Sequence, residues 1–236
     1  MSRTWSVLVT GPLRDREDWL AAAREAGWEP TEWPLLGIVD KDPGAWPMTQ
    51  PDWIAVTSSS VIPALELAAE RAPSLKQVPL AVVGTSSAER LYQAGWTPKL
   101  VPGPGANQAH GLADLLIEEA APEARVLWPH AARATELGEL LLAAGMRLEA
   151  PVVYDVEPVL HLGPPPRTDA VFFASPSAVQ AWLELEADFQ PAGLGIGWTT
   201  LDALLEVDQH FSMSLPLLSP DPAALRLALE SFLPSE

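Results

Sequence analysis

The sequence predicts an α/β protein made of two copies of one folding unit. Short apolar runs alternate with amphipathic helical patterns along the chain, which is typical of βα units on a parallel sheet. Three blocks of sequence also recur in the same order, and chance does not explain such an ordered recurrence. The paired segments are 7–30 with 126–151, 52–67 with 169–185, and 79–91 with 193–205.

The elements of the first copy follow from the spacing of its apolar residues. Strands are expected at 5–10, 53–57, 80–83 and near Leu100. Each strand is followed by an apolar stripe at helical spacing, and the first helix should end at Gly27. The stripes are Trp19, Ala23 and Ala26; Val61, Leu65 and Ala68; Ala88, Leu91 and Tyr92; and Leu112, Leu115 and Leu116.

The second copy repeats this plan. Strands are expected at 126–128, 170–174, 194–197 and around Leu215. The helical stripes are Leu137, Leu140, Leu141 and Ala144; Val179, Trp182 and Leu183; Leu201, Leu204 and Leu205; and Leu225, Ala228, Leu229 and Phe232. Both copies therefore predict a flavodoxin-like unit. The segments 40–51 and 157–166 are rich in proline and glycine and occupy equivalent points, so we interpret them as connections.

Composition narrows the class of protein. Hydrophobic residues make up 48% of the 236 residues and charged residues 19%, which provides apolar material for two cores. A net charge of −17 argues against binding to the nucleic-acid backbone. The absence of cysteine excludes disulfides, a thiolate nucleophile and cysteine-bound zinc. No apolar run approaches the ~20 residues of a membrane span and no leader peptide is visible, so we expect no membrane contact and a cytoplasmic location.

Aromatic residues near the expected turns are interpreted mainly as packing. Five of the ten tryptophans lie beside such turns, and we expect them to close the ends of the cores rather than to stack on a ligand. They are Trp28, Trp33, Trp46, Trp96 and Trp198. Tyr154 lies in the second connection, where packing is the commoner role, although its phenol could also donate a proton.

Four expected strand-to-helix turns carry small hydroxyl residues, at 57–60, 84–87, 174–177 and 197–200. Ligands of open α/β sheets bind beyond the carboxyl ends of the strands, where helix N-termini present free N–H groups. A single serine or threonine at such a turn is most often an N-cap. Four such turns, paired across the duplication, predict instead an anion-binding cleft in which backbone N–H groups and hydroxyls replace the scarce basic residues.

Other kinds of site have weaker support. The glycines of 193–197 have part of the spacing of a dinucleotide turn, but they overlap the strand, and Trp198 would crowd a pyrophosphate. Neither Ser58 nor Ser175 lies in the glycine-flanked elbow of a serine hydrolase. No metal site is expected, because the histidines have no ligand-like spacing. They are His110, His130, His161 and His210.

Together these segments resemble the uroporphyrinogen-III synthase family along nearly the whole chain. They are Thr10-x-Pro12, TSSSVI from Thr57, VGTSSAERL from Val83, VVY ending at Tyr154, ASPSAV from Ala174 and IGWTTLDALL from Ile196. The resemblance implies two flavodoxin-like domains joined by a two-stranded linker, with the chain crossing between them twice. Residues 1–33 plus 159–236 would form one domain and 40–150 the other, with 34–39 and 151–158 as the linker.

The resemblance also implies an activity. Members cyclise hydroxymethylbilane, a linear tetrapyrrole with eight carboxylates, to uroporphyrinogen III in heme biosynthesis, with loss of water and inversion of ring D through a spiro intermediate. It implies a hydro-lyase with no metal or organic cofactor, and we expect a monomer. Tyr154 matches the family's linker tyrosine and would assist departure of the hydroxyl. The expected substrate-binding residues are Thr10, Ser58, Ser60, Gly84, Ser86, Ser87, Ser175, Ser177, Ala178, Gly197, Thr199 and Thr200.

The sequence departs from the family at several polar positions. Gly11 replaces an arginine between Thr10 and Pro12, Ser60 replaces an asparagine, and His130 with Ala131 replaces an arginine-glycine pair. Fewer basic groups would weaken the binding of a polycarboxylate. Two other interpretations therefore stay open: an inactive synthase-like protein with a regulatory role, and a two-lobed ligand-binding protein.

Overall fold

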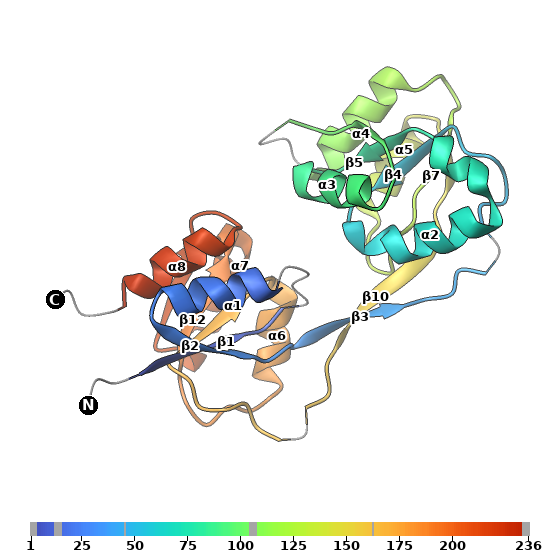
Figure 1. The fold of residues 1–236 in the computed structure, drawn as a ribbon. Coiled ribbons are helices and arrows are strands. Elements are labelled where there is room, and N and C mark those ends of the chain that lie inside the picture. The colour runs from blue at the N-terminus through green and yellow to red at the C-terminus, as the bar shows by residue number, and fades with distance from the viewer. Residues whose placement is uncertain (1–3, 12–15, 45, 104–107, 162, 233–236) are drawn as a thin grey trace. The chain divides into compact units, whose positions relative to one another are not determined.

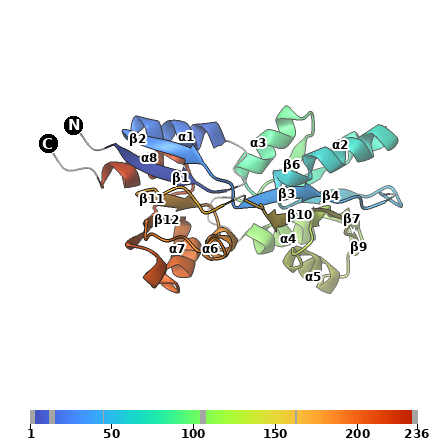
Figure 2. The same cartoon turned by 90° about the horizontal axis from the view of Figure 1, so that it is seen from below.

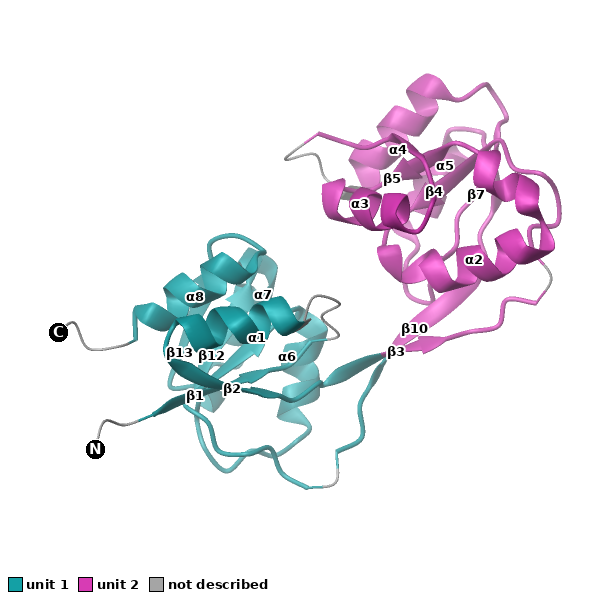
Figure 3. Ribbon diagram, in the orientation of Figure 1, with its two compact units in different colours: residues 1–37, 157–236 teal, residues 38–156 magenta. Residues whose placement is uncertain are grey.

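The computed structural model describes residues 4–11, 16–44, 46–103, 108–161 and 163–232. It has a mixed α/β architecture with parallel sheets, as the sequence predicts (Figure 1). The chain forms two compact units: unit 1 is residues 1–37 with 157–236, and unit 2 is residues 38–156 (Figure 3). The boundaries between the units fall inside two strands, β3 (Leu36–Asp40) and β10 (Val152–Pro158).

Unit 1 is built on a five-stranded parallel sheet of order β13-β12-β11-β1-β2. The strands are β1 (Trp5–Val9), β2 (Trp28–Glu32), β11 (Ala170–Phe173), β12 (Ala192–Ile196) and β13 (Met213–Leu217). Helices α1 (Arg16–Glu25) and α8 (Pro222–Glu230) cover one face of the sheet, and α6 (Pro176–Leu183) and α7 (Gly197–Leu205) cover the other (Figure 2). A short 3₁₀ helix, η3 (Asp208–His210), precedes β13.

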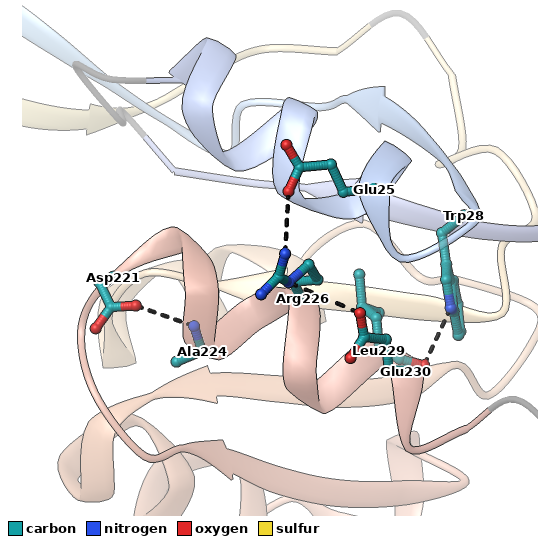
Figure 4. Close-up of polar contacts among 7 residues, drawn as sticks. All are labelled: Glu25, Trp28, Asp221, Ala224, Arg226, Leu229 and Glu230. Atoms are coloured by element: carbon teal, nitrogen blue, oxygen red, sulfur yellow. Dashed lines mark hydrogen bonds and ion pairs between the residues drawn. The ribbon is translucent and has the colours of Figure 1, made fainter.

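The two helices α1 and α8 pack together through their apolar stripes. Trp19 and Ala23 of α1 lie in one buried cluster with Leu225 and Leu229 of α8. The indole Nε1 of Trp28 donates a hydrogen bond to the carbonyl of Leu229 at 3.1 Å (Figure 4). This carbonyl lies in the last turn of α8 and also accepts the N–H of Phe232 at 3.2 Å, so the indole adds a second donor there.

Unit 2 contains a second five-stranded parallel sheet, of order β6-β5-β4-β7-β9. The strands are β4 (Trp53–Val56), β5 (Leu80–Val82), β6 (Pro98–Leu100), β7 (Arg125–Leu127) and β9 (Arg147–Glu149). Its helices are α2 (Ile62–Arg71), α3 (Thr85–Gln93), α4 (Gln108–Glu119) and α5 (Glu136–Ala143), with the 3₁₀ helices η1 (Ser59–Val61) and η2 (Pro73–Gln77). Strand β4 supplies both cores because its side chains alternate: Ile54 and Val56 face one cluster, and Trp53 and Ala55 the other.

A third sheet, of order β3-β10-β8, contains both connections between the units. The N–H of Lys41 donates to the carbonyl of Val153 at 2.9 Å, and that of Val159 donates to Leu35 at 2.9 Å, so β3 and β10 run antiparallel. Strand β8 (His130–Ala131) pairs with β10 in parallel. The two connections are thus the paired strands β3 and β10, and β8 of unit 2 adds a third strand beside β10.

The two main sheets have the same strand order once the duplication is taken into account. Strands β9-β7-β4-β5-β6 of unit 2 occupy the positions of β2-β1-β11-β12-β13 of unit 1. Strands β1, β2, β4, β5 and β6 come from the first sequence copy, and the other five from the second. Each unit thus combines strands from both copies, and the boundary between the copies is not a boundary between units.

The structure corrects several details of the sequence analysis. Tyr92 and Leu205, expected on apolar stripes, are 73% and 53% exposed, because each follows the buried residue of its stripe by one position and so points about 100° away from it. Trp198, expected to close a core, is 69% exposed. Strands β2, β8 and β9 were not found from the sequence. None of the helices in the described ranges has the length and apolar content of a transmembrane segment.

Candidate functional site

The four hydroxyl turns lie at the carboxyl edges of the two main sheets. All strands of each sheet are parallel, so their carboxyl ends share one edge. The turn at 57–60 follows β4 and that at 84–87 follows the neighbouring strand β5. The turn at 174–177 follows β11 and that at 197–200 follows its neighbour β12. Each unit therefore presents one pair of hydroxyl turns.

In each unit, one turn of the pair is capped by its own serine. Ser58 Oγ accepts the N–H of Ser60 at 3.2 Å and lies 3.1 Å from the hydroxyl of Ser60. Ser175 Oγ accepts the N–H of Ala178 at 3.2 Å and lies 3.3 Å from the hydroxyl of Ser177. Ser58 and Ser175 are thus N-caps, as single serines at such turns usually are. Ser177 is exposed and Ser60 is half-buried, so these hydroxyls remain near solvent.

The other turn of each pair is opened by a glycine and has no side-chain cap. Gly84 and Gly197 have φ values of +74° and +70°, and a Cβ added to either would meet nothing within 4 Å. Glycine is therefore required here by backbone conformation and not by crowding. Helices α3 and α7 begin at these turns with no side-chain cap hydrogen bond. Their first N–H groups are available to an anion, with Ser86 and Thr199 exposed beside them and Ser87 half-buried.

Four of the sequence-predicted residues are buried, among them Ala178 at 0% exposed. Thr10 is 0% exposed, and its Oγ1 donates to the carbonyl of Phe172 at 2.7 Å, which ties the end of β1 to β11. Thr200 is 2% exposed. Tyr154 is 7% exposed and lies in the same apolar cluster as Val61. Pro12 of the Thr10-x-Pro12 motif lies outside the described residues.

Unit 2 has a pocket of about 420 Å³ at its carboxyl edge. The pocket lies between β4 and β7, where the strand order reverses direction, and such switch points are where α/β sheets bind ligands. Trp128 after β7 lines the pocket with Thr57 after β4, and the indole Nε1 donates to Thr57 Oγ1 at 3.3 Å. Arg133, Thr135 and Glu136 complete its polar lining.

The sequence analysis did not identify Arg133 or Thr135. Arg133 is exposed, and within the described ranges its guanidinium has no carboxylate or hydrogen-bond partner. Other basic side chains lie within 4 Å of a carboxylate, among them Arg24, Lys76, Lys99, Arg147 and Arg167. The neighbouring carboxylate of Glu136 lies 3.1 Å from Nδ1 of His110. Within the part of the chain that the structure describes, Arg133 is thus a cation without a partner that lines a pocket of an acidic protein.

His130 helps to hold the end of β7 beside this pocket. Its ring stacks on Trp128 with centroids 4.2 Å apart, and its two nitrogens lie 2.8 Å and 3.1 Å from the carbonyls of Ala131 and Ala150. These contacts account for His130 as a packing residue. Among the described residues, no group of three or more histidine or acidic side chains has the arrangement of a metal site.

The fold and the four turns define a class: α/β proteins of two parallel-sheet units, with hydroxyl-bearing turns at the carboxyl edges of both sheets. A family model described as uroporphyrinogen-III synthase HemD matches residues 17–208. The chain belongs to the uroporphyrinogen-III synthase family, and its function is the formation of uroporphyrinogen III in heme biosynthesis.

One solved structure shares this fold at low sequence identity. A mutant uroporphyrinogen III synthase from the bacterium Thermus thermophilus is similar with a TM-score of 0.57 and 18% identity, covering 96% of this chain and 97% of that chain. A wild-type crystal form of the synthase from the same bacterium gives a TM-score of 0.45 at 18% identity, covering 96% of each chain. A comparison with curated protein sequences gives no significant match.

Proposed function

We propose that the protein is a lyase that cyclises hydroxymethylbilane to uroporphyrinogen III without a metal or organic cofactor. The hydroxyl of ring A leaves with a proton as water, and the resulting azafulvene is attacked by the substituted carbon of ring D. The spiro intermediate then fragments and recloses with ring D inverted. The protein's task is to hold the two ends of a flexible chain together, which lowers the entropic cost of ring closure.

The observation that carries this proposal is the pairing of an N-cap turn with an uncapped glycine turn in both units. The uncapped N-termini of α3 and α7 offer N–H donors and a positive helix-dipole end to carboxylates. Ser86, Ser87 and Thr199 add hydroxyl donors at the same turns, and Ser60, Ser177 and Ala178 lie at the neighbouring ones. A substrate with eight carboxylates fits donor groups that are repeated on two similar units.

Arg133 is our addition to this set. The basic residues common in the family at 11 and 130 are absent, so the chain needs another cation to offset its charge of −17 near the substrate. Arg133 lines the unit 2 pocket together with Thr57 and Thr135. A guanidinium binds a carboxylate with two parallel hydrogen bonds, which gives both affinity and orientation.

The proposed roles of the buried residues differ. Tyr154 is proposed to donate a proton to the departing hydroxyl, which rests on the resemblance to the family's linker tyrosine and on the chemistry of a phenol. Thr10 and Thr200 support their turns from within, since Thr10 bonds to Phe172 and both side chains are buried. We further propose that both units are flavodoxin-like. The sheet order of unit 1, numbered along the chain, is 2-1-3-4-5, and unit 2 has the same order when each of its strands takes the number of the equivalent strand of unit 1.

A coupled assay tests the function. Hydroxymethylbilane synthase supplies fresh substrate, and the products are oxidised and separated as uroporphyrin isomers I and III. Uncatalysed closure gives isomer I, so an excess of isomer III that rises with protein concentration is the expected result. Isomer I alone, at the rate seen without protein, would favour one of the two other interpretations, an inactive synthase-like protein or a two-lobed ligand-binding protein. Size-exclusion chromatography of the same preparation tests whether the protein is a monomer, as we propose. In cells, we expect the protein in the cytoplasm.

A further inference from the structure

Trp198 is unusual among the tryptophans of this protein. It is 69% exposed, whereas Trp28 and Trp96 are 3% and 1% exposed. Eight of the ten tryptophans have a ring or cation partner within the described residues, and Trp46 is buried. For Trp198 no such partner is found among the described residues. Its indole therefore has a large apolar surface in water that the fold itself does not use.

The position of Trp198 lies within the proposed site. It stands in the first turn of α7, between Gly197 and Thr199, which we propose to bind substrate carboxylates. The register of β12 with β13 pairs Ile196 with Leu217, so the chain leaves the sheet at Gly197 beside Leu218, which is 89% exposed. The carboxyl edge of unit 1 thus combines apolar surface with free N–H and hydroxyl donors.

The duplicated unit shows that the fold does not need an aromatic residue here. Thr85 is the residue of unit 2 that corresponds to Trp198, since Gly84 corresponds to Gly197. Both positions follow a glycine of positive φ, both begin an uncapped helix, and both are exposed. A threonine therefore satisfies the same backbone, and the indole of Trp198 is free to serve a ligand.

We propose that Trp198 is a stacking platform for one pyrrole ring of the tetrapyrrole, an inference that rests on the proposed function. Flat aromatic rings favour offset stacking on an indole face, and stacking adds to the gain from removing both surfaces from water. The carboxylate arms of the same pyrrole would reach the N–H groups and Thr199 hydroxyl of the α7 turn. Trp198 thereby orients a ring that hydroxyl and N–H donors alone would leave free to rotate.

Three variants test this role. W198T installs the residue that the unit 2 copy carries, W198F keeps an aromatic face, and Leu205→Thr removes an exposed apolar side chain from the other end of the same helix. We expect W198T to raise KM for hydroxymethylbilane about tenfold with a small effect on kcat, and W198F to change KM by less than about threefold. L205T should leave KM unchanged, and thermal unfolding should show that all three are folded.

Binding of reduced uroporphyrinogen III, measured by equilibrium dialysis, separates this inference from the proposed function. If the wild type makes isomer III but W198T has the same KM and the same product affinity, the platform is wrong. Should the wild type make no isomer III, the proposed enzyme is wrong, and the dialysis then decides the platform: tighter binding by wild type than by W198T supports it, and equal or no binding overturns it.

Discussion

Gly195 is the residue at which a single added methyl group should do most damage to the unit 1 edge. A Cβ at Gly195 would lie 3.0 Å from the backbone nitrogen of Leu201 and 3.1 Å from the carbonyl carbon of Thr200. These atoms belong to the first turns of α7 and cannot rotate away. At Gly193, the nearest atoms are side-chain carbons of Leu204 and Phe211, at 3.0 Å and 3.2 Å. The two glycines therefore form a matched pair on one face of β12.

The expected loss for Gly195→Ala follows from this crowding. Overpacking a core costs typically ~1–3 kcal/mol, and a rigid backbone neighbour favours the upper part of that range. Replacing glycine by alanine in a strand recovers roughly 0.5–1 kcal/mol through the unfolded chain. We therefore expect Gly195→Ala to lose about 2 kcal/mol and Gly193→Ala about 1 kcal/mol or less, since its side-chain neighbours can shift.

Urea unfolding followed by circular dichroism and tryptophan fluorescence measures both variants. With a slope of ~1–3 kcal/mol per molar urea, a loss of about 2 kcal/mol lowers the midpoint by roughly 1 M. Gly195→Ala should also raise KM at low temperature, because it displaces the turn that carries Thr199, whereas Gly193→Ala should not. A Gly195→Ala protein as stable as the wild type, or a more damaging Gly193→Ala, would refute this account of α7 packing.

Three further predictions concern single side chains. Tyr154→Phe should keep the midpoint of urea unfolding yet lower the share of isomer III; an unchanged share removes Tyr154 from the mechanism. Arg133→Gln should raise KM about tenfold, which is the loss typical of a charged hydrogen bond. The control Arg125→Gln changes the first residue of β7, at the end of the strand away from the pocket, and should leave KM unchanged. Equal effects of the two substitutions would exclude a specific role for Arg133. Hydrogen bonds from Ser219 and from the backbone N–H of Ala224 hold the pKa of Asp221 below its usual value. Figure 4 shows the bond from Ala224. Because this carboxyl titrates lower in the folded state, its contribution to stability is present above its unfolded pKa of ~3.9 and is lost as pH falls through the folded value. Asp221→Asn should therefore make the midpoint of urea unfolding depend less on pH between about pH 5 and pH ~2. A midpoint that falls with pH as steeply as in the wild type would contradict this prediction.

The sequence predicted the buried elements better than the edges of the sheets. Strands β4, β11 and β12 are short apolar runs because both of their faces are covered. Strands β2 and β9 lie at the edges, and their sequences WEPTE and RLE have no apolar run because one side is exposed. Such strands are fixed by pairing with β1 and β7, which single-sequence periodicity does not contain.

Only part of the candidate site could likewise be predicted from the sequence. The hydroxyl turns could be predicted, because each follows a strand directly and its residue types recur in both copies. Arg133 could not be predicted, since its place in the same pocket as Thr57 depends on β7 pairing with β4 across a long sequence separation. The exposure of Trp198 could not be predicted, because apolar residues at turns are commonly buried and sequence spacing does not distinguish a buried indole from an exposed one.

The exchange of strands between copies gives a prediction about folding. Residues 38–156 contain a complete five-stranded sheet, helices on both of its faces and both buried clusters of unit 2. This segment should therefore fold alone, with cooperative urea unfolding and the blue-shifted emission expected of buried Trp96. Residues 157–236 lack β1, which pairs with both β11 and β2 in the middle of the unit 1 sheet, and should remain largely unfolded alone.

Fragments cut at the boundary between the two sequence copies give a sharper comparison with the fragment 38–156. Fragments 1–120 and 121–236 each contain one whole copy of the repeat, yet each separates strands that are neighbours in the sheets, β4 from β7 and β1 from β11. If the repeat itself were the folding unit, these fragments would fold, and the fragment 38–156 would be no more stable than either of them. We expect the reverse, because the burial of each sheet depends on strands drawn from both copies. Cooperative unfolding of either repeat fragment, together with a molten 38–156, would overturn the assignment of the units.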